Sequence, residues 1–235
     1  MTDKAVSSQT SNKVDQIATA MRQAILEQAL VSGTRLPEDM IGRHFGVSRT
    51  LVRSAITQLA SEGLIDQRPN RGAVVIEPSW DEARDTFDLR IAVEEIVVSR
   101  LVGGLTPEQI QLLKDHVDKE TEARNTGNEA RSIRLASEFH MLLADLTDSP
   151  ILARYMRELA SRCCLILATY SRPHSSECAV SEHHEIIELL QNGEPKTVIK
   201  AMTCHLKSVM DRASIKPSRR STASVVDVLA GYTEK

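Results

Sequence analysis

Three histidines and two arginines are the residues of this sequence with the clearest chemical potential. The histidines are His140, His183 and His205, and each falls in a different segment with helical periodicity. Neutral imidazoles are common metal ligands, but a helical histidine is more often a surface residue or a hydrogen-bonded core residue. Because the sequence does not show whether the three side chains converge, their spacing alone does not establish a metal site.

The two arginines, Arg49 and Arg53, lie four residues apart and therefore share one face of a helix, with Thr50 nearby. A guanidinium group can donate two hydrogen bonds to O6 and N7 of guanine, so such a pair fits reading of the DNA major groove. An isolated pair of this kind is usually part of a solvated helix face. The elements around this pair favour the DNA-reading interpretation.

Those elements predict a winged helix-turn-helix over residues 12–78. A helix with one apolar stripe comes first, a short helix opens at Pro37, and a third helix is capped by Ser48. Two β-prone runs, 64–68 and 73–76, follow and are joined by turn-forming residues. Three helices and a hairpin place the two arginines on a recognition helix.

Other residues of this domain fit contacts to the DNA backbone. Ser48, the backbone N–H groups of the third helix and Arg35 suit phosphate contacts, which position a protein without reading sequence. Arg71 and Gly72, at the hairpin tip, are placed to enter the minor groove.

Charge is distributed unevenly along the 235 residues, whose formal net charge is -3. Residues 1–78 carry nine Lys or Arg against eight Asp or Glu, and residues 43–71 carry five arginines against two acidic residues. Residues 79–235 are net acidic, with 20 basic residues against 24 acidic ones. The basic segment fits DNA, and the acidic remainder argues against a nonspecific architectural DNA-binding protein.

Residues 79–213 predict a second, all-helical domain, which makes the fold mainly α. No convincing strand occurs there, and turn signals separate six helical segments: about 79–102, 106–125, 129–147, 150–171, 179–191 and 195–213. Residues 1–11 are predicted to be disordered, and residues 214–235 to form a flexible tail.

The sequence predicts a cytoplasmic protein with no membrane association. It has no apolar run of about 18 residues and no secretory signal at its polar N-terminus. The four cysteines form no CxxC pair, so reduced and mostly buried thiols are expected.

The N-terminal motifs resemble the winged helix of GntR-family bacterial regulators. They are Gly33-Thr-Arg-Leu-Pro, then Phe45-Gly-Val-Ser-Arg-Thr-Leu-Val-Arg, Glu62-Gly-Leu-Ile and Arg68-Pro-Asn-Arg-Gly-Ala. The resemblance implies operator contacts by the residues at the family's contact positions, which are Arg35, Ser48, Arg49, Thr50, Arg53 and Gly72. Leu51 stands where a smaller residue is frequent, which is expected to alter base preference.

The second domain resembles the FCD effector domain of the FadR-type branch, a bundle of six to seven helices. Its motifs include Phe139-His140-Met-Leu-Leu, Glu182-His183 and Met202-Thr-Cys-His205-Leu. The resemblance implies that His140, His183 and His205 bind one divalent metal ion per subunit, zinc or nickel. Ala136 occupies the usual position of a fourth ligand, which leaves coordination positions for water or an anionic effector.

Arg90, in the first helix of this domain, has two interpretations. It is placed either to meet an effector carboxylate or to form an ion pair with Glu94, four residues later.

The resemblance and the residues together predict a ligand-responsive, sequence-specific transcriptional regulator. We expect a homodimer on palindromic double-stranded DNA, acting as a repressor of a metabolic operon and controlled by a small carboxylate. A metal-dependent hydrolase is the alternative from another class, but neither a helical HExxH nor a Ser or Cys nucleophile motif accompanies the histidines. No enzymatic activity is therefore expected.

Overall fold

The chain forms two units, described by a computed structural model over residues 2–68, 72–170, 179–211 and 224–232. One unit comprises residues 1–77 together with 219–235, and the other comprises residues 78–218. The boundary at Glu77 and Pro78 lies one residue before the predicted boundary. The return of the last residues to the first unit was not predicted.

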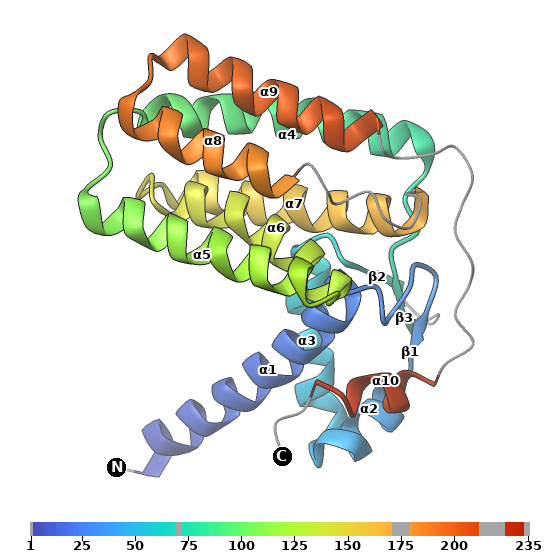
Figure 1. Ribbon diagram of the computed structural model, residues 1–235. Coiled ribbons are helices and arrows are strands. Elements are labelled where there is room, and N and C mark those ends of the chain that lie inside the picture. Colours follow the sequence, from blue (N-terminus) through green and yellow to red (C-terminus); the bar gives the residue numbers. More distant parts are fainter. Residues whose placement is uncertain (1, 69–71, 171–178, 212–223, 233–235) are drawn as a thin grey trace. The chain divides into compact units, whose positions relative to one another are not determined.

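The first unit contains the predicted winged helix-turn-helix (Figure 1). Its helices are α1 (Thr2–Leu26), α2 (Glu38–Phe45) and α3 (Arg49–Ser61). Gly46, with φ 62°, adopts the left-handed conformation that ends α2 and turns the chain into α3. The apolar stripe of α1 is buried with Val52, Ile56 and Leu59 of α3, as the helical spacing predicted.

The wing is a three-stranded antiparallel sheet with the order β1-β3-β2. Its strands are β1 (Arg35–Leu36), β2 (Ile65–Arg68) and β3 (Gly72–Val75). The predicted hairpin pairs Ile65 with Val75 and Arg68 with Gly72. The short β1 was not predicted, because two residues are too few for alternation to show in a sequence.

Both ends of the chain differ from the predictions. Residues 2–11, predicted to be disordered, belong to α1. Residues 2–11 contain no glycine or proline, so no helix-breaking residue separates them from the rest of α1. Within the predicted flexible tail, residues 225–229 form a helix, α10 (Val225–Leu229).

The helix α10 packs against α1 and α2. Val225 is almost completely buried and Leu229 is completely buried. The hydroxyl of Tyr232 donates to Oε2 of Glu27 at 2.8 Å. This part of the tail is therefore a packed component of the first unit.

The second unit is an all-helical bundle whose six described helices begin and end within two residues of the predicted limits. They are α4 (Trp80–Leu101), α5 (Pro107–Asn125), α6 (Glu129–Asp145), α7 (Pro150–Tyr170), α8 (Ala179–Asn192) and α9 (Pro195–Asp211). Ser79 and Thr106 form reciprocal capping boxes at the starts of α4 and α5. The caps explain why these two helix starts were readable in the sequence.

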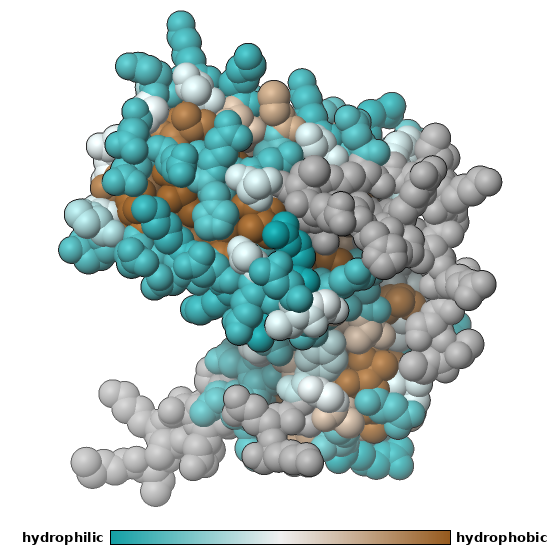
Figure 2. Space-filling view, in the orientation of Figure 1, coloured by the Kyte–Doolittle hydropathy of each residue, from teal (hydrophilic) through white to brown (hydrophobic). Residues whose placement is uncertain are grey.

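The six helices form a closed ring of neighbours in the order α4, α7, α6, α5, α8 and α9, with α9 returning to α4. The ring encloses a core that includes Phe139, Leu143, Val97, Val198 and Met202. Its outer side chains over α5, α8 and α9 are mainly hydrophilic, with hydrophobic residues visible between them (Figure 2). None of the described helices is long and apolar enough to cross a membrane.

Candidate metal centre and DNA-reading face

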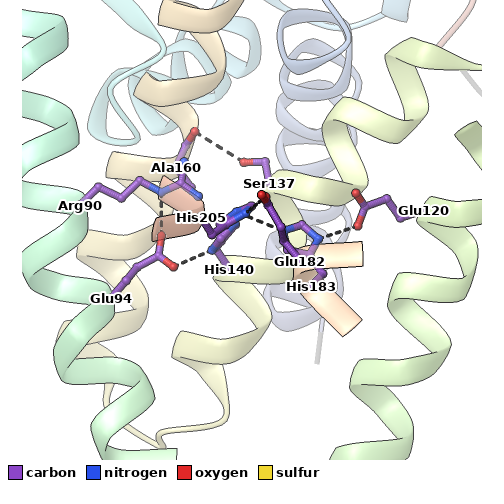
Figure 3. A network of polar contacts seen from close by, with 9 residues as sticks. All are labelled: Arg90, Glu94, Glu120, Ser137, His140, Ala160, Glu182, His183 and His205. Atoms are coloured by element: carbon purple, nitrogen blue, oxygen red, sulfur yellow. Dashed lines mark hydrogen bonds and ion pairs between the residues drawn. The ribbon is translucent and has the colours of Figure 1, made fainter. Parts of the chain in front are cut away.

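Three imidazole rings meet inside the bundle (Figure 3). His140 lies on α6, His183 on α8 and His205 on α9, and all three are buried. Nε2 of His205 lies 3.3 Å from Nε2 of His140 and 3.3 Å from Nε2 of His183. The structure thus brings together the three histidines that the sequence selected, with one ligand atom of each within 4.8 Å of the others.

A glutamate contacts the far nitrogen of each ring. The Nδ1 contacts are His140 to Glu94 at 2.6 Å, His183 to Glu120 at 2.8 Å and His205 to Glu182 at 2.7 Å. An ionised carboxylate only accepts hydrogen bonds, so each contact favours the tautomer with its proton on Nδ1. The lone pairs of the Nε2 atoms then face one another at the centre, as in metal-binding histidines held by carboxylates.

This donor set fits a divalent cation. Nitrogen lone pairs 3.3 Å apart repel one another unless a proton or a cation lies between them. A tetrahedral zinc site with Zn–N bonds of about 2.0–2.1 Å has N–N separations of about 3.3 Å, as seen here for two of the three pairs. With all three glutamates ionised, their charges and that of the Arg90 guanidinium sum to two negative charges, which such an ion would offset.

Burial keeps the three rings uncharged. It lowers the pKa of His140 well below the ordinary histidine value, that of His183 to about 3, and also that of His205. Burial also raises the pKa of Glu120 to about 7. The carboxyl of Glu120 therefore gains its proton near neutral pH, whereas the ring of His183 beside it stays neutral.

Arg90 forms the ion pair that was one of its two predicted roles. Its Nε donates to Oε1 of Glu94 at 2.7 Å, and both side chains are buried. Because the other oxygen of Glu94 contacts His140, the pair links the guanidinium to the centre. An effector contact by Arg90 stays a prediction.

The group of converging ligand side chains includes neither Ala136 nor any cysteine of the described residues. Ala136 lies one turn before His140 on α6 and ends in a methyl group, so it cannot supply a fourth ligand. Cys163 is a free, buried thiol, and its burial raises the pKa of the thiol to about 11. Cys164 is also free and buried, whereas Cys204 is exposed, and Cys178 lies outside the described residues.

The predicted DNA-reading residues lie on the exposed side of α3. Arg49, Thr50 and Arg53 are exposed at its N-terminal half. Ser48 occupies the predicted N-cap position, but its side chain makes no cap hydrogen bond. The hydroxyl is expected to serve phosphate contact instead of capping.

Both arginines of the reading face are paired with acidic residues of α2. Arg53 donates from Nε to Oε1 of Glu38 at 3.1 Å and from Nη2 to Oε2 at 2.7 Å. Arg49 forms an ion pair through Nε with Oδ1 of Asp39. The two acidic residues stand in the first turn of α2, where negative side chains are favoured by the helix dipole.

The wing brings two further predicted contact residues together. Arg35 of β1 and Gly72 of β3 line the same surface hollow, together with Met40 of α2 and Val225 of α10. Gly72 has φ 78°, a conformation that side chains disfavour. Arg71, the predicted tip residue, lies outside the described residues.

Sequence reasoning missed the acidic partners in both places. Glu120 lies on the same face of α5 as the buried residues Leu113 and Val117, at helical spacing from them. This spacing was the signal in the sequence that could have predicted its burial. Glu38 and Asp39 lie just before residues 43–71, the segment that the sequence analysis identified as positively charged. The fold, and not the local charge balance, places them beside the arginines.

The winged helix and the helical bundle with an internal polar centre define a class of two-domain, DNA-binding transcriptional regulators. The FCD domain model matches residues 85–208, and the model of bacterial regulatory proteins of the gntR family matches residues 13–75. The chain belongs to the GntR family, in the branch with an FCD domain. The predicted family and fold class are confirmed.

Known relatives agree with this assignment. The chain is 27% identical to the HTH-type transcriptional repressor RspR of Escherichia coli K12 over 197 residues, which cover 83% of this chain and 86% of RspR. It shares its fold with a GntR regulator from Rhodococcus sp. RHA1, at a TM-score of 0.73 and 23% identity, over 85% of this chain and 96% of that one. E. coli McbR/YncC gives a TM-score of 0.71 at 20% identity, over 85% of this chain and 93% of that chain.

Proposed function

We propose that this chain is a repressor whose operator affinity is controlled by a small carboxylate bound at a metal centre. The observation that carries this proposal is the convergence of three buried Nε2 atoms, each from an imidazole held by a glutamate. The relative RspR is a repressor, which supports the proposed direction of control.

His140, His183 and His205 would hold one face of a zinc or nickel ion. When bound, the ion would supply a Lewis-acidic attachment point for an effector carboxylate. The methyl group of Ala136 leaves coordination positions for water or that carboxylate. Because burial already keeps the rings unprotonated, proton competition should weaken metal binding only at pH values below the ordinary histidine range.

The proposed operator contacts divide into two kinds. Arg49 and Arg53, with Thr50, would read bases in the major groove. The remaining contacts, to phosphates and the minor groove, are proposed for Arg35, Ser48, Arg71 and Gly72. A homodimer would place two such faces on a palindrome.

Metal titration of the full-length protein tests the centre. Wild type, His183→Ala and Ala136→Asp are stripped with a chelator and titrated with zinc and nickel. We expect one ion per wild-type subunit, loss of binding in His183→Ala, and tighter binding in Ala136→Asp, which adds an oxygen ligand on the same helix face. His184→Ala is the matched control, because it removes the neighbouring imidazole and leaves the three converging rings intact.

Absence of metal binding in wild type and in Ala136→Asp would contradict the metal centre. The effector part has its own test, in which small organic acids are screened for thermal stabilisation of the metal-loaded protein. An effector should change operator affinity by about 1–3 kcal/mol. Binding that leaves operator affinity unchanged would contradict effector control.

A further inference from the structure

The ion pair between Glu38 and Arg53 has a geometry that bears on DNA reading. The carboxylate occupies one edge of the planar guanidinium, through Nε at 3.1 Å and Nη2 at 2.7 Å. The side chain of Arg53 is 61% exposed, whereas that of Glu38 is only 21% exposed. The arginine is therefore open to a DNA ligand while its partner is set back against the protein.

This arrangement leaves the reading edge of the arginine usable. A guanidinium carries five N–H donors in one plane, and Glu38 takes only those of the Nε edge. The end of the group, formed by Nη1 and the second hydrogen of Nη2, retains the spacing that matches O6 and N7 of guanine. Pairing with Glu38 and reading of a base are thus compatible.

The same pair restrains the arginine. A free arginine side chain has many rotamers and can reach a phosphate as readily as a base edge. A two-point contact with a carboxylate fixes the plane of the group and places a negative charge beside it. Arg49 is also paired with an acidic residue of α2, through a contact of its Nε with Oδ1 of Asp39.

We propose that Glu38 is a positioning residue for operator specificity, which holds the Nε edge of Arg53 so that its end points at a base and not at the backbone. The inference rests on the proposed base contact of Arg53. If the pair only tied α2 to α3, its loss would change the affinity for all DNA sequences alike. The loss of stability itself should be small, because exposed ion pairs contribute little to it.

The test compares two kinds of DNA. An operator is selected from a random library with the wild-type protein, and affinities for it and for random DNA of equal length are measured at several salt concentrations. In Glu38→Gln, the ratio of operator to random affinity should fall about tenfold, the scale of losing one oriented base contact. Random affinity should rise, and its salt dependence should steepen by about one charge, because Arg53 becomes free to reach a phosphate.

Three variants make the result specific. Asp15→Asn removes an exposed carboxylate of α1 and should leave the ratio unchanged. In Arg53→Ala, the further change Glu38→Gln should have no effect on the ratio, since its target is gone. Thermal unfolding of each variant confirms that the domain is folded.

Two outcomes separate the proposals. If Glu38→Gln shifts operator and random affinities equally while Arg53→Ala lowers the ratio, the positioning role of Glu38 is wrong and the base contact stands. If Arg53→Ala itself leaves the ratio unchanged, the base contact of Arg53 is wrong, and the positioning role falls with it.

Discussion

At the scale of single residues, the three histidines in the bundle are held by glutamates whose position could not be predicted from the sequence. The three histidines were found from their types and from the family resemblance, but none of their glutamate partners was predicted to contact a histidine: Glu94 was considered only as a partner of Arg90, and Glu120 and Glu182 were given no such role. A glutamate on a helix is usually solvated, and only the packing of the ring of helices turns these carboxylates inward. The prediction from the sequence therefore selected the three histidines that converge and missed the glutamates that contact them.

Burial of the neutral imidazoles predicts acid sensitivity of the metal-free protein. The lowered pKa values of His140 and His205 mean that the unfolded chain binds protons that the folded chain does not. The free energy of unfolding should therefore fall as the pH drops below about 6.5, the ordinary histidine pKa. The pair of His183 and Glu120 should contribute little, because it carries about one proton in both states between pH 5 and 6, on Glu120 when folded and on His183 when unfolded.

Urea unfolding of chelator-treated protein between pH 5 and 8 measures this dependence. The variant His205→Gln should show a smaller loss of stability on acidification, since it lacks one of the two groups that gain a proton on unfolding. Stability that rises toward pH 5 in the wild type would contradict the assignment of neutral, buried rings.

At the scale of elements, apolar spacing and turn residues predicted the helices well. The bounds of α4 to α9 agree within two residues, because capping residues and glycines mark them in the sequence. The short elements β1 and α10 were missed, since two and five residues do not establish a period. The partners of α10 lie about 200 residues earlier in the chain, beyond any local pattern.

The turn between α8 and α9 should tolerate no side chain at Gly193. A Cβ atom there would lie 2.4 Å from the carbonyl oxygen of Leu189, a backbone atom that cannot move cheaply. Gly193→Ala should therefore lower the free energy of unfolding by about 1–3 kcal/mol. Gly104→Ala is the control, because its Cβ would meet its nearest neighbour at an ordinary 3.7 Å.

Thermal unfolding and metal titration of both variants measure the effect. Because α8 carries His183 and α9 carries His205, Gly193→Ala should also weaken metal binding. Equal behaviour of the two variants would show that the turn adapts without cost.

The helix α10 should stabilise the DNA-binding unit. Leu229 is fully buried, so Leu229→Ala should lower the free energy of unfolding of this unit by about 2–4 kcal/mol. Asp227→Ala, at an exposed position of the same helix, should have almost no effect. Hydrogen exchange of α1 and α2 locates the loss, and unchanged protection in Leu229→Ala would contradict a packing role for α10.

At the scale of the whole molecule, one recognition helix reads only a few base pairs, so the proposed dimer should depend on the spacing of two half-sites. Inserting five base pairs between the half-sites of the selected operator rotates one half-site relative to the other by half a turn of the DNA helix. Affinity should fall about a hundredfold or more, toward that of a single half-site. Insertion of ten base pairs is the control for rotation, and sedimentation gives the subunit number. Equal affinity for all three spacings would contradict a rigid dimer.

The path of the chain through its two units has a consequence for biosynthesis. The DNA-binding unit is built from two segments of the chain, one before the bundle and one after it, so the whole bundle is encoded between them. Because translation runs from the N-terminus, the apolar site for Val225 and Leu229 stays uncovered until the bundle and then α10 have been translated. A chain that terminates inside the bundle emerges with an unfinished DNA-binding unit, which chaperones and proteases can remove before it competes for the operator.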